Sequence, residues 1–209
     1  VIALPTILLS NRPGYPHRAG LPVSSETLHA MLEALEANGW LSKIDAVFAG
    51  YMPSVTHVSL ISTWIAELKA RNSALISCCD PILGDEPTGL YVPEDVASAI
   101  RNTLLPVSDI LTPNNFELSW LAEISVSSSR EAMNASEKLD PTVLTTSLPV
   151  GLDMLANFLH CRDGAWSTHV KRRSYVAHGS GDMMAALFLG HYLRTRSFVD
   201  ALALATGGI

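Results

Sequence analysis

Residues 44–81 read IDAVFAGYMPSVTHVSLISTWIAELKARNSALISCCDP. The stretch contains two short apolar segments, 44–49 and 74–79, which flank a longer segment, 55–71, that we expect to be helical. A strand, a helix and a second strand in this order predict two parallel strands joined by a crossover helix. Because both strands are almost continuously apolar, we expect a parallel sheet that is covered on both faces.

The same alternation continues in both directions along the chain. Further strands are expected over 2–9, 109–111 and 143–145, and helices over 25–38, 93–104, 115–122, 130–139, 182–194 and 198–205. Residues 154–161 and 165–170 bracket Asp163-Gly164, a strong hairpin-turn signal, so they are expected to pair as an antiparallel edge. The predicted fold class is α/β, with a central, mostly parallel sheet, an antiparallel edge and one domain over residues 1–209.

Composition excludes several classes of protein. The chain has 209 residues, of which 48% are hydrophobic and 16% charged, which is enough for a large core. The net charge is −6 and basic residues are scattered apart from 171–173, which argues against a nucleic-acid partner. Three cysteines without ligand spacing argue against a disulfide framework or a zinc site and fit a cytoplasmic location.

The ends of the chain and its apolar segments bear on location and completeness. No apolar stretch approaches the roughly 20 residues of a membrane span, and no signal peptide is visible, so no membrane partner is expected. Val1 opens an apolar run without an initiator methionine, and residues 206–209 stop where a helix is ending. We expect both natural terminal segments to lie outside this sequence.

Polar residues cluster where the expected strands end. The clusters are Ser10-Asn11, Gly50-Tyr51, Asp80, Thr112 with Asn114, and Thr146-Ser147. Each cluster alone could be an ordinary turn. Ligands of open α/β sheets bind beyond the carboxyl ends of the strands, so the shared placement predicts one site at that edge.

A glycine-rich turn precedes an apolar helix at residues 178–187, HGSGDMMAAL. Gly179 and Gly181 let backbone N–H groups approach a ligand, and a helix starting at Asp182 adds free N–H groups and a positive dipole end. These features favour an anion site with a carboxylate at its rim. The site would suit phosphoryl transfer to an alcohol, with the carboxylate taking the alcohol's proton. The alternative is that Asp182 only caps its helix.

Three acidic residues fit a cation beside a polyphosphate. Asp80 and Asp85 would need a cation such as Mg²⁺, which prefers oxygen ligands, between them and phosphate groups. Alternatively, Asp80 is a turn former before Pro81. Asn114 and Glu117 have the spacing of a capping box, and a capped glutamate can still hold a metal-bound water.

Other polar and aromatic residues have two interpretations each. Thr146-Ser147 would hydrogen-bond a phosphate or form a strand-end turn, and Lys171 would flank a nucleotide or belong to a solvated strand end. Tyr51 would lie flat against an aromatic substrate or belong to the core. The histidines without a partner visible from spacing are treated as structural: His17, His57 and His160.

Taken in order, these motifs resemble those of the pyridoxal kinases, ribokinase-like enzymes of vitamin B6 salvage. The matching stretches are 10–15 (SNRPGY), 49–51 (AGY), 79–85 (CDPILGD), 89–94 (GLYVPE), 109–118 (DILTPNNFEL), 145–147 (TTS) and 179–182 (GSGD). The resemblance implies a ribokinase-like three-layer α/β/α fold and ATP-dependent phosphorylation of the 5′-hydroxymethyl group of pyridoxal, pyridoxine and pyridoxamine. It also implies Mg²⁺, a possible monovalent cation and a homodimer.

The resemblance carries roles to individual positions. Asp182 would be the base, and Gly179, Ser180 and Gly181 would surround the γ-phosphoryl group. The nucleotide side would comprise Asp80, Asp85, Thr112, Asn114, Glu117, Thr146, Ser147 and Lys171, with Asp80 and Glu117 facing the metal. The substrate pocket would comprise Ser10, Pro13, Gly14, Tyr51 and Asp182.

The chain departs from its relatives' pattern at two places. Ser180 stands where the family usually has threonine, and Arg12-Pro13 stands where many members have His-Thr. Serine keeps the hydroxyl group, whereas proline removes a hydroxyl group and a backbone donor, which bears on ring specificity more than on the reaction. Two alternatives are a related kinase of hydroxymethylpyrimidine or a sugar, and a non-catalytic protein that binds a B6 vitamer.

Overall fold

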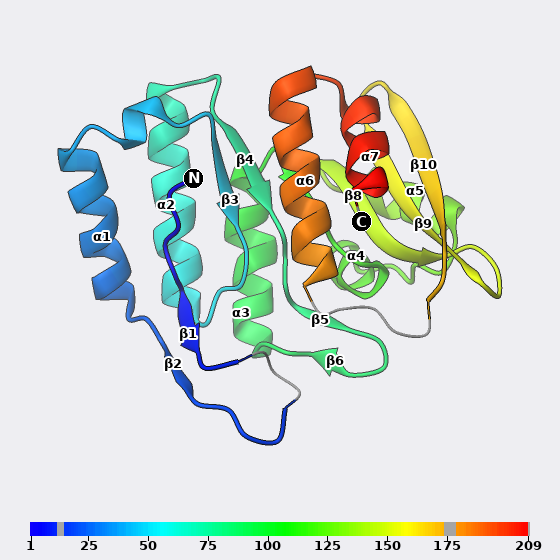
Figure 1. Cartoon of the computed structure of the whole chain (residues 1–209), viewed down its shortest axis with the longest axis horizontal. Coiled ribbons are helices and arrows are strands. Elements are labelled where there is room, and N and C mark those ends of the chain that lie inside the picture. Colours follow the sequence, from blue (N-terminus) through cyan, green and yellow to red (C-terminus); the bar gives the residue numbers. More distant parts are fainter. Residues whose placement is uncertain (12–14, 174–178, 209) are drawn as a thin grey trace.

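A six-stranded sheet forms the centre of the molecule (Figure 1). The computed structural model describes residues 1–11, 15–173 and 179–208. The strand order is β10-β9-β8-β7-β4-β3. The strands are β3 (Ala46–Ala49), β4 (Ile76–Cys79), β7 (Ile110–Leu111), β8 (Thr142–Pro149), β9 (Met154–Cys161) and β10 (Gly164–Lys171). The neighbours from β3 to β8 pair in parallel, and β9 pairs antiparallel with both β8 and β10. The predicted parallel sheet with an antiparallel edge is therefore confirmed.

Helices cover both faces of this sheet. One face carries α2 (Val55–Arg71), α3 (Glu94–Ala99), α4 (Asn115–Ala122) and α5 (Ser129–Ser136), and the other carries α6 (Ser180–Thr195) and α7 (Phe198–Gly207). Neighbouring strand residues divide between the two faces, as side chains that alternate along a strand must. Cys79 and Leu111 pack into the α2–α5 layer, while Cys78 and Ile110 pack beneath α6 and α7.

Short polar residues set the helix starts. Ser24, Ser54, Asn114 and Ser128 each precede a helix, and each side chain accepts a hydrogen bond from a backbone N–H in the first turn. The first of these helices, α1 (Ser25–Ala37), packs against α2 and ends before Gly39, whose φ is +68°. Among the described residues, no helix has both the length and the apolar character needed to cross a bilayer.

The structure corrects several expected boundaries. Only β1 (Ile7–Leu9) of the expected strand 2–9 forms, and it pairs with β2 (Gly20–Pro22) in a separate antiparallel ribbon. A second small ribbon, β5 (Gly84–Asp85) with β6 (Gly89–Leu90), was not predicted. The helix expected over 93–104 is α-helical only to Ala99 and continues as a π-helical turn, Ile100–Leu104. Strands of two or three residues give too little sequence pattern to be predicted.

Candidate active site

The carboxyl ends of the parallel strands lie along the lower edge of the sheet in Figure 1. Asp80 directly follows β4 and Thr112 directly follows β7. Backbone hydrogen bonds continue across this edge: Asp80 N donates to Ala49 O at 2.8 Å, Thr112 N to Cys79 O at 3.1 Å, and Thr146 N to Pro113 O at 2.9 Å. The predicted residues after β3, β4, β7 and within β8 are therefore brought together.

Asp80 is the most constrained acidic residue at this edge. Asp80 is only 6% exposed. Burial, followed by the negative charge of Asp182, raises the pKa of Asp80 to about 7, while the neighbouring Thr112 hydroxyl opposes the shift. The ion pairs formed by the described residues do not involve Asp80. A buried carboxylate without a basic partner is costly, so this position favours a cation.

Glu117 joins α4 to the segment that follows β4. Its Oε1 accepts hydrogen bonds from the backbone N–H groups of Leu83 (2.9 Å) and Gly84 (3.4 Å), and its Oε2 accepts one from Asn114 N (2.9 Å). Burial raises the pKa of Glu117 to about 8; the charge of Asp80 adds to the shift, whereas the backbone donors oppose it. A carboxylate oxygen has two acceptor sites, so Oε1 is filled by its two donors whereas Oε2 retains one site, and the clamp leaves room for one outer ligand.

Asn114 completes the predicted capping box. Its Oδ1 accepts a hydrogen bond from Glu117 N at 2.9 Å, and its Nδ2 donates to Gly84 O at 2.8 Å. Both ends of the amide therefore bind the protein itself. Asn114 positions the β5 segment against α4, a role that its spacing to Glu117 indicated only in part.

Two buried polar atoms at this edge have no hydrogen-bond partner of ordinary geometry among the described residues. They are Thr112 Oγ1 and Asp85 Oδ1. Burial, and then the neighbouring Asp85, raise the pKa of Tyr91. Because buried polar groups are almost always paired, unpaired ones at a sheet edge favour a bound ligand.

The glycine turn forms the start of α6. Gly179, with φ +91°, is the N-cap residue, and α6 begins at Ser180 rather than at the expected Asp182. Gly179 is the N-cap, and no side chain of the described residues makes a capping hydrogen bond there, so the alternative in which Asp182 acts as the cap is wrong. Met183 N donates to Gly179 O at 2.9 Å, which leaves the N–H groups of residues 180–182 without intrahelical acceptors. The turn therefore presents a group of N–H donors at a positive helix end.

Asp182 lies in the first turn of α6 and is exposed. A Cβ atom placed on Gly179 would lie 3.7 Å from Asp182 Oδ2. The carboxylate therefore extends over the turn, and its negative charge contributes to the raised pKa of Asp80. This arrangement places a solvent-accessible base beside the N–H donors, which suits proton removal next to a bound phosphoryl group.

The end of β8 is irregular at the predicted phosphate contact. The register between β8 and β9 shifts between Thr145 and Leu148, and Ser147 has φ +56°. A non-glycine residue in this conformation is uncommon, and bulges of this kind often redirect side chains at functional sites. Ser147 is exposed whereas Thr146 is buried, so the two predicted residues differ in access.

The remaining predicted residues divide between this edge and the β1–β2 ribbon. Lys171 ends β10, and since β10 runs parallel to β8, Lys171 lies at the same edge and is exposed. Tyr51 follows β3 and is half-buried. Ser10 follows β1, so its expected place at the end of a strand of the main sheet is wrong; its Oγ accepts from Ala19 N at 3.0 Å within the ribbon. Pro13 and Gly14 lie outside the described residues.

The acidic residues at this edge form at most part of a metal site. Within the described ranges, no three His, Cys, Asp or Glu side chains converge as a metal site by themselves. Mg²⁺ in phosphoryl-transfer sites is typically held by one or two carboxylates together with substrate phosphates and water. Buried Asp80, with the Thr112 hydroxyl beside it, fits such a partial ligand set.

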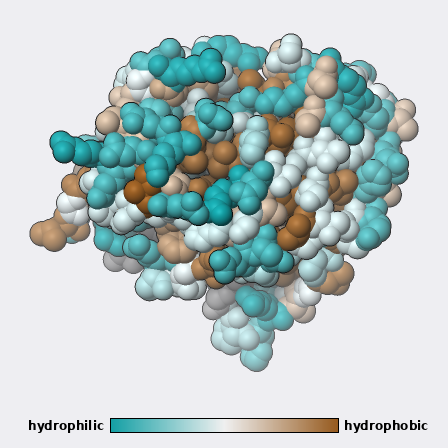
Figure 2. All heavy atoms as spheres, turned by 180° about the vertical axis from the view of Figure 1, so that it is seen from behind, coloured by the Kyte–Doolittle hydropathy of each residue, from teal (hydrophilic) through white to brown (hydrophobic). Residues whose placement is uncertain are grey.

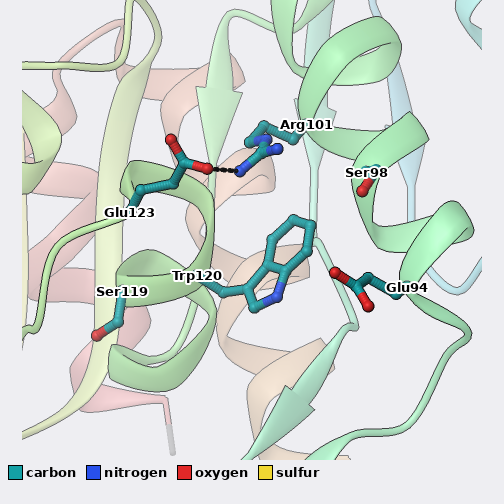
Figure 3. A pocket seen from close by; sticks show the side chains of 6 residues that line it. All are labelled: Glu94, Ser98, Arg101, Ser119, Trp120 and Glu123. Carbon is teal, nitrogen blue, oxygen red and sulfur yellow. Dashed lines mark hydrogen bonds and ion pairs between the residues drawn. The ribbon is translucent and has the colours of Figure 1, made fainter.

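A separate cavity of about 310 Å³ lies between α3 and α4 (Figure 3). Its lining residues are Glu94, Ser98, Arg101, Ser119, Trp120 and Glu123. Arg101 stacks over Trp120 at 4.9 Å and donates to Glu123 Oε1 at 2.6 Å. None of the predicted site residues lines this cavity. On the face opposite to that of Figure 1, hydrophilic side chains are interspersed with smaller hydrophobic areas (Figure 2).

Comparison with known proteins defines the class. A family model described as phosphomethylpyrimidine kinase matches residues 13–209. A layered α/β sheet with a helix N-terminus and two carboxylates at its carboxyl edge agrees with a kinase of small alcohols.

Individual relatives narrow the class from kinases of small alcohols to pyridoxal kinases. The chain is 34% identical to pyridoxal kinase PdxY of Rubrobacter xylanophilus, over 100% of this chain and 75% of the relative, and 31% identical to that of Corynebacterium diphtheriae, over 98% and 75%. The pyridoxal kinase structure from Entamoeba histolytica superimposes with a TM-score of 0.89 at 27% identity, covering 97% of this chain and 74% of the other. The pyridoxal kinase from Leishmania donovani in complex with ADP and pyridoxamine gives 0.88 at 30%, over 97% and 72%. The chain belongs to the pyridoxal kinase family.

Proposed function

We propose that the chain transfers the γ-phosphoryl group of ATP to the 5′-hydroxymethyl group of pyridoxal, pyridoxine or pyridoxamine. Structural relatives from Leishmania donovani are complexes with ADP and either pyridoxamine or pyridoxine. The observation that carries the proposal is the exposed Asp182 carboxylate over the Gly179 turn, beside the N–H groups of the first turn of α6 and the buried Asp80.

In the proposed mechanism, the N–H groups at the start of α6 bind the oxygens of the transferring phosphoryl group. They are fixed donors at a positive helix end, so they stabilise the charge that develops during transfer. Asp182 accepts the proton of the hydroxymethyl group while the oxygen of that group attacks the γ-phosphorus of ATP, and ADP leaves. The carboxylate needs access to the alcohol, and its exposure provides that access.

The proposed metal ligands are Asp80 directly and Glu117 through a water molecule. Mg²⁺, when bound, neutralises charge on the phosphates. Glu117 is held by three backbone donors, which supports the outer position rather than direct contact. Thr112, whose hydroxyl lies beside the Asp80 carboxylate, would donate to a phosphate or to a metal-bound water.

The remaining assignments place the nucleotide and the vitamer on either side of α6. The nucleotide side comprises Asp85, Asn114, Thr146, Ser147 and Lys171, with Asn114 acting through the β5 segment that it holds. The vitamer side comprises Ser10 and Tyr51, together with Pro13 and Gly14. We also propose one kinase domain over residues 1–209, a homodimer and a cytoplasmic location.

An ADP-release assay with three alcohols tests the substrate class. Pyridoxal, hydroxymethylpyrimidine and ribose are supplied separately with Mg²⁺ and ATP. The proposal expects the highest kcat/KM with pyridoxal. Because the matching family model is described as phosphomethylpyrimidine kinase, hydroxymethylpyrimidine is the second candidate, and preference for it would overturn the assignment to B6 vitamers.

Asp182→Asn tests the mechanism. The amide keeps the size of the side chain but cannot accept the proton, so kcat should fall by about 10²- to 10⁴-fold. ATP binding by calorimetry and the far-UV circular dichroism spectrum should stay unchanged, because Asp182 is exposed and does not cap α6. Turnover close to that of the wild type would rule out Asp182 as the base.

A further inference from the structure

The β1–β2 ribbon has little core of its own. No residue of β1 or β2 is buried, and the two strands pair only with each other. In Figure 1 the ribbon lies below the first turn of α2, next to the segment that follows β3. Because apolar packing does not fix the ribbon, its position depends on hydrogen bonds at its base.

Two hydrogen bonds tie this base to the body of the protein, and a third joins its two ends to each other. Thr6 Oγ1 donates to Tyr51 O at 2.7 Å, and Val23 N donates to Thr6 O at 3.0 Å. His57 Nε2 lies 2.8 Å from Val23 O. The chain of hydrogen bonds therefore runs from Tyr51 through Thr6 and Val23 to His57, and it holds both ends of the ribbon.

His57 is fixed from both sides of its imidazole. The residue lies in the first turn of α2 and is only 5% exposed. A carbonyl oxygen can only accept, so Nε2 carries the proton that it donates to Val23 O. In the neutral ring, Nδ1 then accepts from the hydroxyl of Ser54, which lies 2.7 Å away and is the N-cap of α2. Ser54 thus fixes the tautomer and the direction of the Nε2–H group.

We propose that His57 is a positioning residue that sets the β1–β2 ribbon relative to Tyr51 and thereby the affinity for the vitamer. The inference rests on the proposed function, which assigns Ser10 on the ribbon and Tyr51 to the pyridine ring. From spacing alone, His57 is interpreted as a structural residue. Its hydrogen bond to Val23, 34 residues away, gives it a specific task at the vitamer side of the site.

Steady-state kinetics on the full chain test the functional part. His57→Phe keeps an aromatic ring of similar size but leaves Val23 O and the Ser54 hydroxyl without the imidazole. The expected result is a rise of about tenfold in KM for pyridoxal, because an unmade buried hydrogen bond shifts an equilibrium by about that factor. The kcat and the KM for ATP should stay within about twofold. His57→Gln restores a donor and an acceptor and should recover most of the vitamer affinity.

Lys69→Met is the matched control at the other end of α2. Lys69 Nζ donates to Asp109 Oδ1 at 2.7 Å and to Val107 O at 3.1 Å, so its loss destabilises the same helix without contacting the ribbon. Its KM for pyridoxal should equal that of the wild type. An equal rise in KM for Lys69→Met and His57→Phe, or no rise for His57→Phe, overturns the inference.

Hydrogen–deuterium exchange tests the positioning part without turnover. In His57→Phe, amides of residues 6–11 and 15–23 should exchange faster, while those of α6 and α7 stay unchanged. Unchanged exchange in these residues overturns the positioning role even if the chain turns over no vitamer. If the wild type neither binds nor turns over any vitamer, the proposed function and the link to vitamer affinity are overturned. Faster exchange in the variant would in that case still support the positioning of the ribbon by His57.

Discussion

At the scale of single residues, two non-glycine helix ends adopt a left-handed conformation. Glu123 (φ +55°) ends α4 and Arg196 (φ +54°) ends α6. Glycine is favoured at this position because it has no Cβ to clash with the backbone. Glu123 gains a compensating contact from Arg101, which donates to its Oε1 at 2.6 Å. Arg196 is exposed and its cap contact is a backbone one, from its N–H to Tyr192 O.

Arg196→Gly is expected to stabilise the protein by about 0.5 to 1 kcal/mol, because relief of the left-handed strain outweighs the entropy of glycine in the unfolded chain. Urea denaturation should show a higher midpoint with an unchanged m-value. Glu123→Gly is the control, and its gain should be smaller because it also removes the partner of Arg101. A lower midpoint for Arg196→Gly would contradict the role of backbone strain.

At the scale of elements, the β5–β6 ribbon is held against α4 by a network that local sequence indicates only in part. The spacing of Asn114 and Glu117 predicts their capping box, which forms. That the same two side chains also bind Leu83 and Gly84 depends on tertiary contact between segments about 30 residues apart. The close approach of β5 to β6 requires glycine at position 84, because a Cβ atom there would lie 2.2 Å from Gly89 O.

Gly84→Ala should push β5 away from β6 and loosen the hydrogen bonds to Glu117. We expect a loss of about 1 to 3 kcal/mol in the free energy of unfolding, as for other overpacked sites, and a higher KM for ATP because Asp85 moves with β5. Thermal denaturation and ADP-release kinetics measure the two effects. Gly190→Ala, in open space on α6, is the control and should be neutral or stabilising. Similar behaviour of the two variants would show that β5 tolerates a side chain.

At the scale of the whole molecule, two buried carboxyl groups of the site make the free energy of unfolding depend on pH. Burial raises the pKa of Asp80 to about 7 and that of Glu117 to about 8, so both carboxyl groups bind protons more tightly in the folded state. Their stabilising contribution is complete below the unfolded pKa values near 4 and is lost as pH rises through the folded values. The protein without ligand therefore carries buried acidic groups that a bound cation would favour.

The free energy of unfolding should consequently fall between about pH 4 and 8, with a contribution of up to about 1.4 kcal/mol per pH unit from each group. Asp80→Asn should flatten this slope and unfold at higher urea concentration than the wild type at pH 8, while losing activity. Urea denaturation at several pH values without Mg²⁺ measures the difference. An identical pH slope in the two proteins would exclude Asp80 as a source of the dependence.

The sequence by itself determined the layered α/β architecture, the antiparallel edge, most helix starts and the cluster of polar residues at the strand ends. These follow from local rules, because strand and helix periods, capping residues and Asp-Gly turns are encoded within a few residues. It also indicated Asp182 and the turn at Gly179, although it began α6 two residues late.

Only the tertiary structure decided how the ribbons and side chains meet. The β1–β2 and β5–β6 strands are too short for a sequence pattern, and their places depend on single hydrogen bonds from distant residues such as His57 and Glu117. The burial of Asp80 and Thr112 likewise arises only where neighbouring strands come together. Burial and long-range hydrogen bonding are properties of packing, so no local pattern in residues 44–81 or elsewhere could specify them.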